Sequence, residues 1–381
     1  MKCRYSLLLF IIMAGYAETT LAQNYRLTVI IDSVPAFTAD SAALFLAGSF
    51  NNWNPQDNNF RFRKQDGHYR AELNAAPGLI EFKTTKGGWD KVETDQDGKS
   101  IANRTVRLQS DSSIHIAVRG WQDHFGKKEK MHTASKNVTI IEAFYMPQLK
   151  RSRTLRIYLP PGYTTDKKKR YPVLYLQDGQ NVFDEFTSYA GEWDVDGFMD
   201  TTALPRSIVV AIDNGGDKRL DEYCPYPVKR IPHAEGNAYA DFMVQTLKPY
   251  IDTHYRTLKS KPNTFIAGSS MGGLISFYTA LKYPKIYGGI GVFSPSFWVT
   301  EHKIDEDVKR LGPGMQALIY FYVGLLEGDT MPNDLLRIMK ELAAVSKAQL
   351  TAVIRSGGRH NEEAWRKEFP LFYQAVILKK K

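Results

Sequence analysis

The pentapeptide Gly268-Ser269-Ser270-Met271-Gly272 places a serine between two glycines. Strand-like residues 264–267 precede it, and helix-like residues 272–282 follow it. A sharp strand–turn–helix elbow strains the backbone at the serine, and the flanking glycines keep neighbouring chains from clashing. The helix also directs its N-terminus at the site, which favours developing negative charge. The motif predicts a nucleophile at Ser270, the alternative being a serine that only caps a helix.

A serine hydroxyl needs a base to take its proton before it attacks a carbonyl carbon. In hydrolases built on such an elbow, the chain order is serine, acid, histidine. Two histidines, His302 and His360, follow Ser270 in the sequence. His302 comes before two further strand-like segments, whereas His360 follows the last of them, in a glycine-rich loop before the final helix. We expect His360 to be the base, the alternative being an ordinary surface histidine.

The acid should come from the loop that follows the strand-like residues 318–323. This loop contains Glu327 and, two residues later, Asp329. The acid holds the imidazole in one tautomer and stabilises the imidazolium, which either carboxylate could do. We rank Glu327 first and Asp329 second, and each could instead be a solvated loop carboxylate.

An acyl-transfer site also needs two amide donors for the oxyanion. We expect one from Met271, directly after the nucleophile. The other should come from the loop after residues 173–176, where Gly179 permits close approach; Gln180 is the first choice and Asn181 the second. The alternative is a simple Asp-Gly turn.

Two patterns of elements surround these residues. Residues 23–122 show short alternating stretches separated by turn residues, which predicts a small all-β sandwich. Residues 123–137 are polar and are expected to form a linker. From residue 138 to 381, buried strand patterns alternate with amphipathic helices, which is typical of an α/β fold with a parallel sheet covered on both faces. The predicted strands of the two regions are 26–31, 43–47, 69–73, 80–84, 114–118, 173–176, 208–212, 264–267, 290–293, 318–323 and 350–354, and the predicted helices are 239–253, 271–282, 333–345 and 362–378.

The first 22 residues have a basic start, an apolar stretch and small residues before Gln23, as in a secretory signal peptide. The apolar stretch is too short to span a membrane, and no later segment is long enough. Removal of this segment would leave Cys224 as the sole thiol, with no internal disulfide, in the periplasm or the medium. The net charge of +9 over 381 residues forms no basic stripe, so we expect no nucleic-acid partner. No motif for a metal or cofactor is present, and we expect neither.

Residues 138–381 resemble the esterase family of α/β-hydrolases that includes feruloyl, acetyl xylan and enterochelin esterases. The matching segments are 156–163, 174–181, 268–273, 294–298 and 358–360. The resemblance implies an α/β-hydrolase fold and a serine hydrolase with Ser270 as nucleophile and His360 as base. It also implies Glu327 as the acid, although many members carry Asp at that place.

The same resemblance implies that several side chains line the substrate pocket. These are Arg219, Glu222, Tyr223 and Trp298. Each could equally be structural, as a buried ion pair or a core aromatic residue.

The N-terminal region resembles immunoglobulin-like glycogen- and starch-binding modules. The matching segments are 47–53, 82–83, 88–89 and 102–104. The resemblance implies that Trp53 and Trp89 stack on sugar rings while Lys83 and Asn103 bind hydroxyl groups, since the apolar face of a sugar suits an aromatic ring. The alternative is that Trp53 belongs to the sandwich core.

These observations favour a secreted serine carboxylic-ester hydrolase that removes acyl groups, feruloyl or acetyl, from polysaccharides or oligosaccharides. The loop Asp178-Gly179-Gln180-Asn181 keeps a second substrate class open, a siderophore trilactone of the enterochelin type. A third possibility, of another class, is a glycan-binding protein whose hydrolase domain is inactive.

Overall fold

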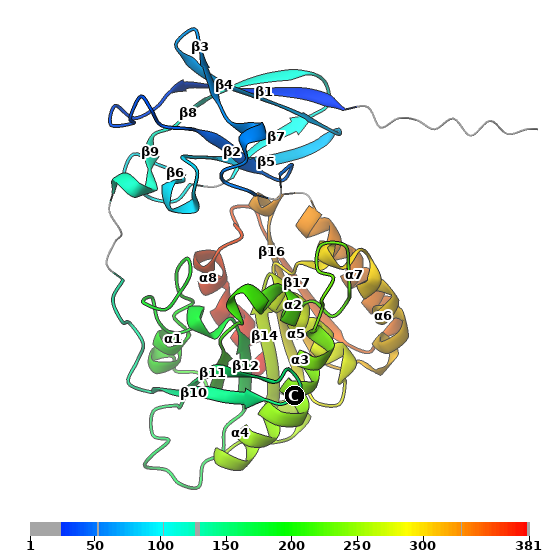
Figure 1. The fold of residues 1–381 in the computed structure, drawn as a ribbon. Helices are drawn as coiled ribbons and strands as arrows, with labels where there is room; N and C mark the ends of the chain where they lie inside the picture. The colour runs from blue at the N-terminus through cyan, green and yellow to red at the C-terminus, as the bar shows by residue number, and fades with distance from the viewer. Residues whose placement is uncertain (1–23, 52, 102, 126–129, 329, 379–381) are drawn as a thin grey trace, which may run out of the picture. The chain divides into compact units, whose positions relative to one another are not determined.

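The computed structural model describes residues 24–51, 53–101, 103–125, 130–328 and 330–378 (Figure 1). They belong to two compact units, Met1–Lys128 and Glu129–Lys381. The predicted signal peptide and Asp329 lie outside the described residues.

The first unit consists of two larger β-sheets and one two-stranded sheet around one apolar core, as expected for an all-β sandwich. One sheet has the order β3 (Arg63–Gln65), β4 (His68–Ala75), β1 (Tyr25–Ser33) and β8 (Ser112–Ala117). The other has the order β2 (Phe45–Gly48), β5 (Gly78–Thr85) and β7 (Arg104–Leu108), and β6 (Glu93–Thr94) pairs with β9 (Gly120–Trp121). Leu27 and Val29 of β1 join Phe82 of β5 in the core. All five stretches predicted as strands here overlap strands, although residues 43–44 and 118 lie outside β2 and β8.

The second unit is built on one eight-stranded sheet with the order β10-β11-β13-β12-β14-β15-β16-β17. The strands are β10 (Val138–Met146), β11 (Arg151–Tyr158), β12 (Val173–Gln177), β13 (Ile208–Ile212), β14 (Thr264–Ser269), β15 (Gly289–Phe293), β16 (Leu318–Gly324) and β17 (Gln349–Arg355). In this order, all neighbouring strands from β13 to β17 are parallel. Strand β11 runs antiparallel to both of its neighbours, β10 and β13. The strand order reverses direction beside β12, where ligands bind at the carboxyl ends of open α/β sheets.

Helices cover both faces of this sheet. The helices are α1 (Val195–Thr201), α2 (Arg219–Tyr223), α3 (Gly236–Phe242), α4 (Lys248–His254), α5 (Met271–Lys282), α6 (Lys303–Leu311), α7 (Thr330–Val345) and α8 (Glu362–Phe372). One apolar cluster joins the sheet to α3–α7, and another joins its opposite face to α1 and α8. Most of the longer helices bury one side against strands that are apolar on both faces, whereas α5 is buried along almost all of its length.

Part of the predicted linker is bound to the second unit. The amide and hydroxyl of Thr133 donate to Asp184 and Glu192 at 3.0 and 2.8 Å. The amide of Ser135 donates to Asp196 at 2.6 Å, and its hydroxyl donates to Asp200 at 2.6 Å. Residues 130–137 are therefore fastened by carboxylates of the β12–α1 segment and of α1.

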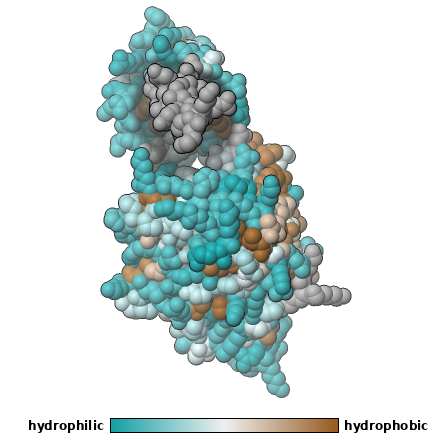
Figure 2. Space-filling model, turned by 90° about the vertical axis from the view of Figure 1, so that its right-hand side faces the viewer, coloured by the Kyte–Doolittle hydropathy of each residue, from teal (hydrophilic) through white to brown (hydrophobic). Residues whose placement is uncertain are grey.

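The surface seen in Figure 2 is mainly hydrophilic, with apolar side chains in small separate patches. Among the described residues, no helix is both long and apolar enough to span a bilayer.

Candidate active site

Ser270 stands at the elbow between β14 and α5, with φ 57° and ψ −124°. Its amide donates to the carbonyl of Phe293 at 2.9 Å. The glycines around it are required by close approach, since a Cβ on Gly268 would lie 2.6 Å from the carbonyl oxygen of Gly272. A Cβ on Gly272 would in turn lie 2.9 Å from Oδ2 of Asp178. The elbow therefore has the strained geometry that the sequence motif predicts.

Three strand ends of the sheet carry the same kind of backbone strain. Asp178 after β12, Ser270 after β14 and Ser294 after β15 are non-glycine residues with φ of 56°, 57° and 44°. Such conformations cost of order 1–3 kcal/mol each and gather at functional sites. The strain marks the carboxyl edge of the central strands as the candidate site.

His360 and Glu327 form a hydrogen-bonded pair, with Nδ1 2.9 Å from Oε2. The side chain of Glu327 has no exposed surface, and that of His360 is 38% exposed. The other carboxylate oxygen of Glu327 accepts from the hydroxyl of Ser294 and from the amide of Gly324, both at 2.7 Å. Trp365 completes the support, because its indole Nε1 donates to the Ser294 hydroxyl at 3.0 Å. This arrangement fixes the carboxylate against one imidazole nitrogen and leaves the other nitrogen available for a substrate or nucleophile.

The hydroxyl of Ser270 is hydrogen-bonded to the hydroxyl of Ser296 at 3.2 Å rather than to His360. Catalytic hydrogen bonds are often long or poorly aligned without substrate, so this arrangement leaves the pairing of Ser270 with His360 to the bound state. Ser296 and Ser294 lie on one turn after β15, where one contacts Ser270 and the other contacts Glu327. That turn therefore joins the nucleophile to the acid.

The two predicted oxyanion donors follow β14 and β12. Met271 is the first residue of α5, where an amide has no acceptor within its own helix. Gln180 lies in the single turn Gly179–Asn181, and its amide has no backbone partner among the described residues. The amide of Asn181, in contrast, donates to the carbonyl of Asp178 at 2.8 Å. The geometry thus favours Gln180 over Asn181 as the second donor.

The residues named as pocket contacts divide into two groups. Arg219 and Trp298 reach the surface, with 25% of the Arg219 side chain and 43% of Trp298 exposed. Glu222 and Tyr223 are fully buried. Arg219 is held over the Tyr223 ring by a bidentate ion pair with Asp178, at 2.6 and 2.9 Å. Glu222 and Tyr223 therefore lie inside the protein, where Glu222 takes part in an ion pair and Tyr223 packs under Arg219.

Sequence patterns gave no role to Asp178, Ser294, Ser296 or Trp365. Asp178 orders Arg219, and the other three position Glu327 or Ser270. Their positions could have indicated two of them. Asp178 and Ser294 come at the ends of predicted buried strands, at the same edge of the sheet as Ser270.

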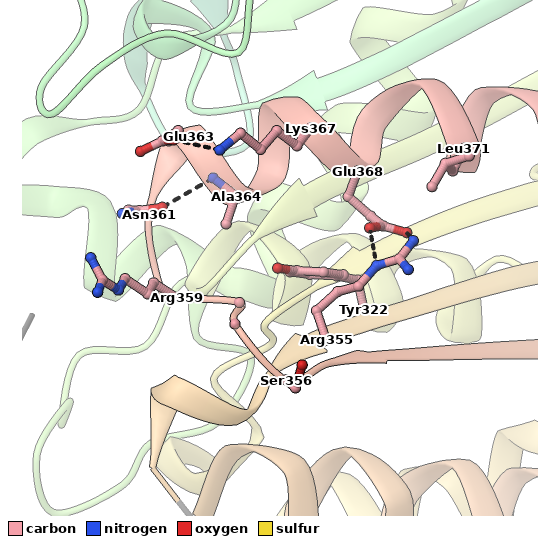
Figure 3. A pocket seen from close by; sticks show the side chains of 12 residues that line it. Tyr322, Arg355, Ser356, Arg359, Asn361, Glu363, Ala364, Lys367, Glu368 and Leu371 are labelled. Atoms are coloured by element: carbon pink, nitrogen blue, oxygen red, sulfur yellow. Dashed lines mark hydrogen bonds and ion pairs between the residues drawn. The ribbon is translucent and has the colours of Figure 1, made fainter.

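A cavity of about 470 Å³ lies beside the turn that carries His360 (Figure 3). Its lining comes from Tyr322 of β16, residues 355–359 and 361, and one side of α8 as far as Leu371, and it includes neither Ser270 nor His360. The ion pairs Arg355–Glu368 and Lys367–Glu363 cross its wall. It is separate from the arrangement around the elbow.

In the first unit, the rings of Trp53 and Trp89 lie 6.3 Å apart at 40°. Trp89 is 40% exposed, Trp53 is half-buried with φ 60°, and Asn103 is exposed. The ammonium group of Lys83 donates to the carbonyl of Ile101. The two neighbouring indoles are called the Trp53–Trp89 platform below.

Residues 146–372 match the model of the Esterase family, described as "Putative esterase". The chain belongs to the Esterase family. This esterase is a carboxylic-ester hydrolase.

Two relatives and one solved structure illustrate the relationship. A bifunctional endo-1,4-β-xylanase/feruloyl esterase from Xylanibacter ruminicola is 24% identical over 266 residues, 68% of this chain and 33% of that one. The iron(III) salmochelin esterase of Escherichia coli is 24% identical over 229 residues, 57% of this chain and 52% of that one. The enterobactin esterase of Shigella flexneri, at 16% identity, superposes with a TM-score of 0.51 over 87% of this chain and 88% of that one. This last likeness bears on the fold alone.

Proposed function

We propose that this esterase is a serine hydrolase in which Ser270 is the nucleophile, His360 the base and Glu327 the acid. The observation that carries the proposal is the 2.9 Å contact between His360 and Glu327 at the edge of the sheet where Ser270 stands. The buried, fully hydrogen-bonded state of Glu327 supports a positioning and electrostatic role for this carboxylate.

The reaction would follow from these positions. His360 Nε2 takes the proton of Ser270 as its oxygen attacks the ester carbonyl carbon, and the amides of Met271 and Gln180 bind the oxyanion. The intermediate expels the alkoxide, which receives the proton from His360 and leaves an acyl group on Ser270. Water, deprotonated by His360, then attacks the acyl carbon. The bond to the Ser270 oxygen breaks, His360 returns its proton to that oxygen, and the carboxylic acid is released.

For the substrate, we propose an acyl group, feruloyl or acetyl, carried by a polysaccharide or its fragments. The xylanase/feruloyl esterase relative and the Trp53–Trp89 platform support this class. Glycan binding by the first unit and secretion through the predicted signal peptide belong to the same proposal. The salmochelin esterase relative supports the second class, a siderophore trilactone.

The decisive variant is Ser270→Ala. We expect kcat on p-nitrophenyl acetate to fall by on the order of 10³-fold or more while the thermal midpoint stays near that of the wild type. Undiminished turnover would overturn the assignment of the nucleophile. A wild-type protein that resists fluorophosphonate labelling yet binds a polysaccharide would instead favour the inactive, glycan-binding alternative.

Substrate class is tested by comparing kcat/KM on methyl ferulate, acetylated xylan and a ferric catecholate trilactone. The first two should be preferred if the polysaccharide proposal holds, and a clear preference for the trilactone would replace it. Trp89→Ala, with the exposed Phe37→Ala as matched control, tests the platform by affinity electrophoresis in soluble starch and xylan.

A further inference from the structure

Glu362 is a buried carboxyl beside the candidate triad that the reaction above does not use. It is the first residue of α8 and follows His360 by two residues. The side chain of Asn361 caps the helix by accepting from the amide of Ala364 at 3.0 Å. Glu362 is only 7% exposed. The capped helix start therefore places this carboxyl in fixed relation to the base.

Glu362 contacts the loop that carries the second oxyanion donor. Its Oε1 accepts from Nδ2 of Asn181 at 3.3 Å. Asn181 follows Gln180 directly and organises that loop, since its side-chain oxygen accepts from the amide of Tyr189 at 2.9 Å and its carbonyl accepts from the amide of Trp193 at 2.8 Å. One hydrogen bond thus connects the segment of His360 to the segment of Gln180.

The charge of Glu362 has no ion-pair partner among the described residues. Arg219, which lies within electrostatic range, is already bound by both carboxylate oxygens of Asp178. Burial and the neighbouring Asp178 raise the pKa of Glu362, while His360 and Arg219 act in the opposite direction. Burying a carboxyl without an ion-pair partner lowers the stability of the fold. A role in the candidate site therefore explains the position of Glu362 better than a contribution to folding does.

We propose that Glu362 is a positioning residue, which through Asn181 holds the Gly179–Asn181 turn so that the Gln180 amide faces the oxyanion formed beside His360. This inference rests on the proposed roles of His360 and Gln180. Oxyanion donors act only when they lie about 2.7–3.1 Å from the developing charge, and small misplacements cost large factors in rate. Because the contact serves the transition state, its loss should lower kcat while leaving KM nearly unchanged.

The test compares Glu362→Ala, Glu362→Gln, Asn181→Ala and the double variant Glu362→Ala/Asn181→Ala on p-nitrophenyl acetate. The matched control is Glu363→Ala, since the neighbouring Glu363 is exposed and pairs with Lys367. We expect kcat of Glu362→Ala and of Asn181→Ala to fall about 10- to 100-fold. Glu362→Gln should stay within about threefold of the wild type, because its amide oxygen still accepts from Asn181. The double variant should be no slower than the slower single variant.

Three results would overturn the proposal. One is wild-type kcat in Glu362→Ala. Another is a loss in the double variant equal to the product of the single losses. The third is a kcat of Glu362→Gln as low as that of Glu362→Ala, together with a wild-type kcat in Asn181→Ala. That result would mean that the carboxylate charge acts on His360 directly. If Glu362→Ala does not fold, as judged by circular dichroism, Glu362→Gln and Asn181→Ala still decide. Failure of the proposed function would appear separately, as retained activity in Ser270→Ala.

Discussion

Two buried glutamates of the esterase unit, Glu222 and Glu327, are held in opposite ways. Both side chains are fully shielded from solvent. Arg151 and Arg153 bind Glu222 through their guanidinium groups, at 3.0 and 2.5 Å. Glu327 is bound by the neutral hydroxyl of Ser294, a backbone amide and the imidazole of His360. Two arginines compensate the charge of Glu222. The Glu327 carboxylate is held in its orientation by groups that include no arginine or lysine.

The difference separates a carboxylate in a buried ion pair from the carboxylate proposed as the acid of the triad. Two arginines neutralise Glu222 continuously, so it has no charge to offer a transient cation. A hydroxyl and a backbone amide hold Glu327 in place, and in the proposed mechanism its charge stabilises the imidazolium that forms during turnover. The partners therefore distinguish the two roles, and variants of each residue should have different consequences.

The largest expected effect is on turnover by Glu327→Gln. The amide oxygen would keep the contacts with Ser294 and Gly324, but the amide NH₂ would face Nδ1 of His360 and favour the wrong tautomer. We expect kcat to fall by on the order of 10³- to 10⁴-fold, with little change in thermal midpoint. Steady-state kinetics on p-nitrophenyl acetate provides the measurement. A loss below tenfold, together with a large loss in Asp329→Ala, would transfer the role of the acid to Asp329.

The next effect is on stability, in Glu222→Ala. Removing this carboxylate leaves the guanidinium groups of Arg151 and Arg153 without their shared partner, which typically costs about 3–5 kcal/mol in a buried pair. Urea denaturation should show this loss in the free energy of unfolding. Glu235→Ala is the control, because Glu235 is a more exposed partner of Arg151 and its loss should cost about 1 kcal/mol or less. A Glu222→Ala protein that is as stable as the wild type but has a strongly reduced kcat would contradict the structural role given to Glu222.

A third buried carboxyl, Asp196, sharpens the comparison because it accepts the Ser135 amide and has no ion pair among the described residues. Burial raises the pKa of Asp196 to about 6. The folded protein then binds a proton more tightly than the unfolded chain, so stability falls as the pH rises from about 4 to 6. The expected component is about 3 kcal/mol. Asp196→Asn should flatten this part of the stability–pH curve; an unchanged curve would contradict the assignment.

The smallest effect is expected for Ser294→Ala, which removes the hydroxyl donor of Glu327 while leaving the Gly324 amide in place. We expect kcat to fall about tenfold, since a hydrogen bond to a charged group contributes about 1.5 kcal/mol or more. Trp365→Phe, which removes the indole donor to the same hydroxyl, should lose less. If Ser294→Ala were as slow as Glu327→Gln, the neutral support would be as important as the carboxylate itself.

Much of the fold could be predicted from local patterns. The segment from β14 through the elbow to α5 has nearly the expected bounds, because a buried strand, two close-packed glycines and an apolar helix each leave a strong signal. Helices α1 and α2 were not predicted, since five to seven residues are too few to show a helical period. The highly polar α6 was also not predicted. Strand β10 was missed as well, because only one of its residues is fully buried.

The candidate site, too, could be predicted from the sequence only in part. Chain order predicted the pairing of His360 with Glu327, because the fold fixes which loops meet at the sheet edge. The roles of Ser294, Ser296 and Glu362 depend on contacts between loops distant in sequence, which no local pattern encodes. For the same reason, the burial of Glu222 could be named only as one of two possibilities.

The attachment of residues 130–137 determines where the chain can be divided. A truncated esterase that begins at Val138 would lack the groups that donate to Asp184, Asp196 and Asp200. Those carboxylates would then lose hydrogen bonds, and the loss would loosen the segment that leads from the Gln180 turn to α1. A fragment intended to report on the chemistry of this enzyme should therefore begin no later than Lys130.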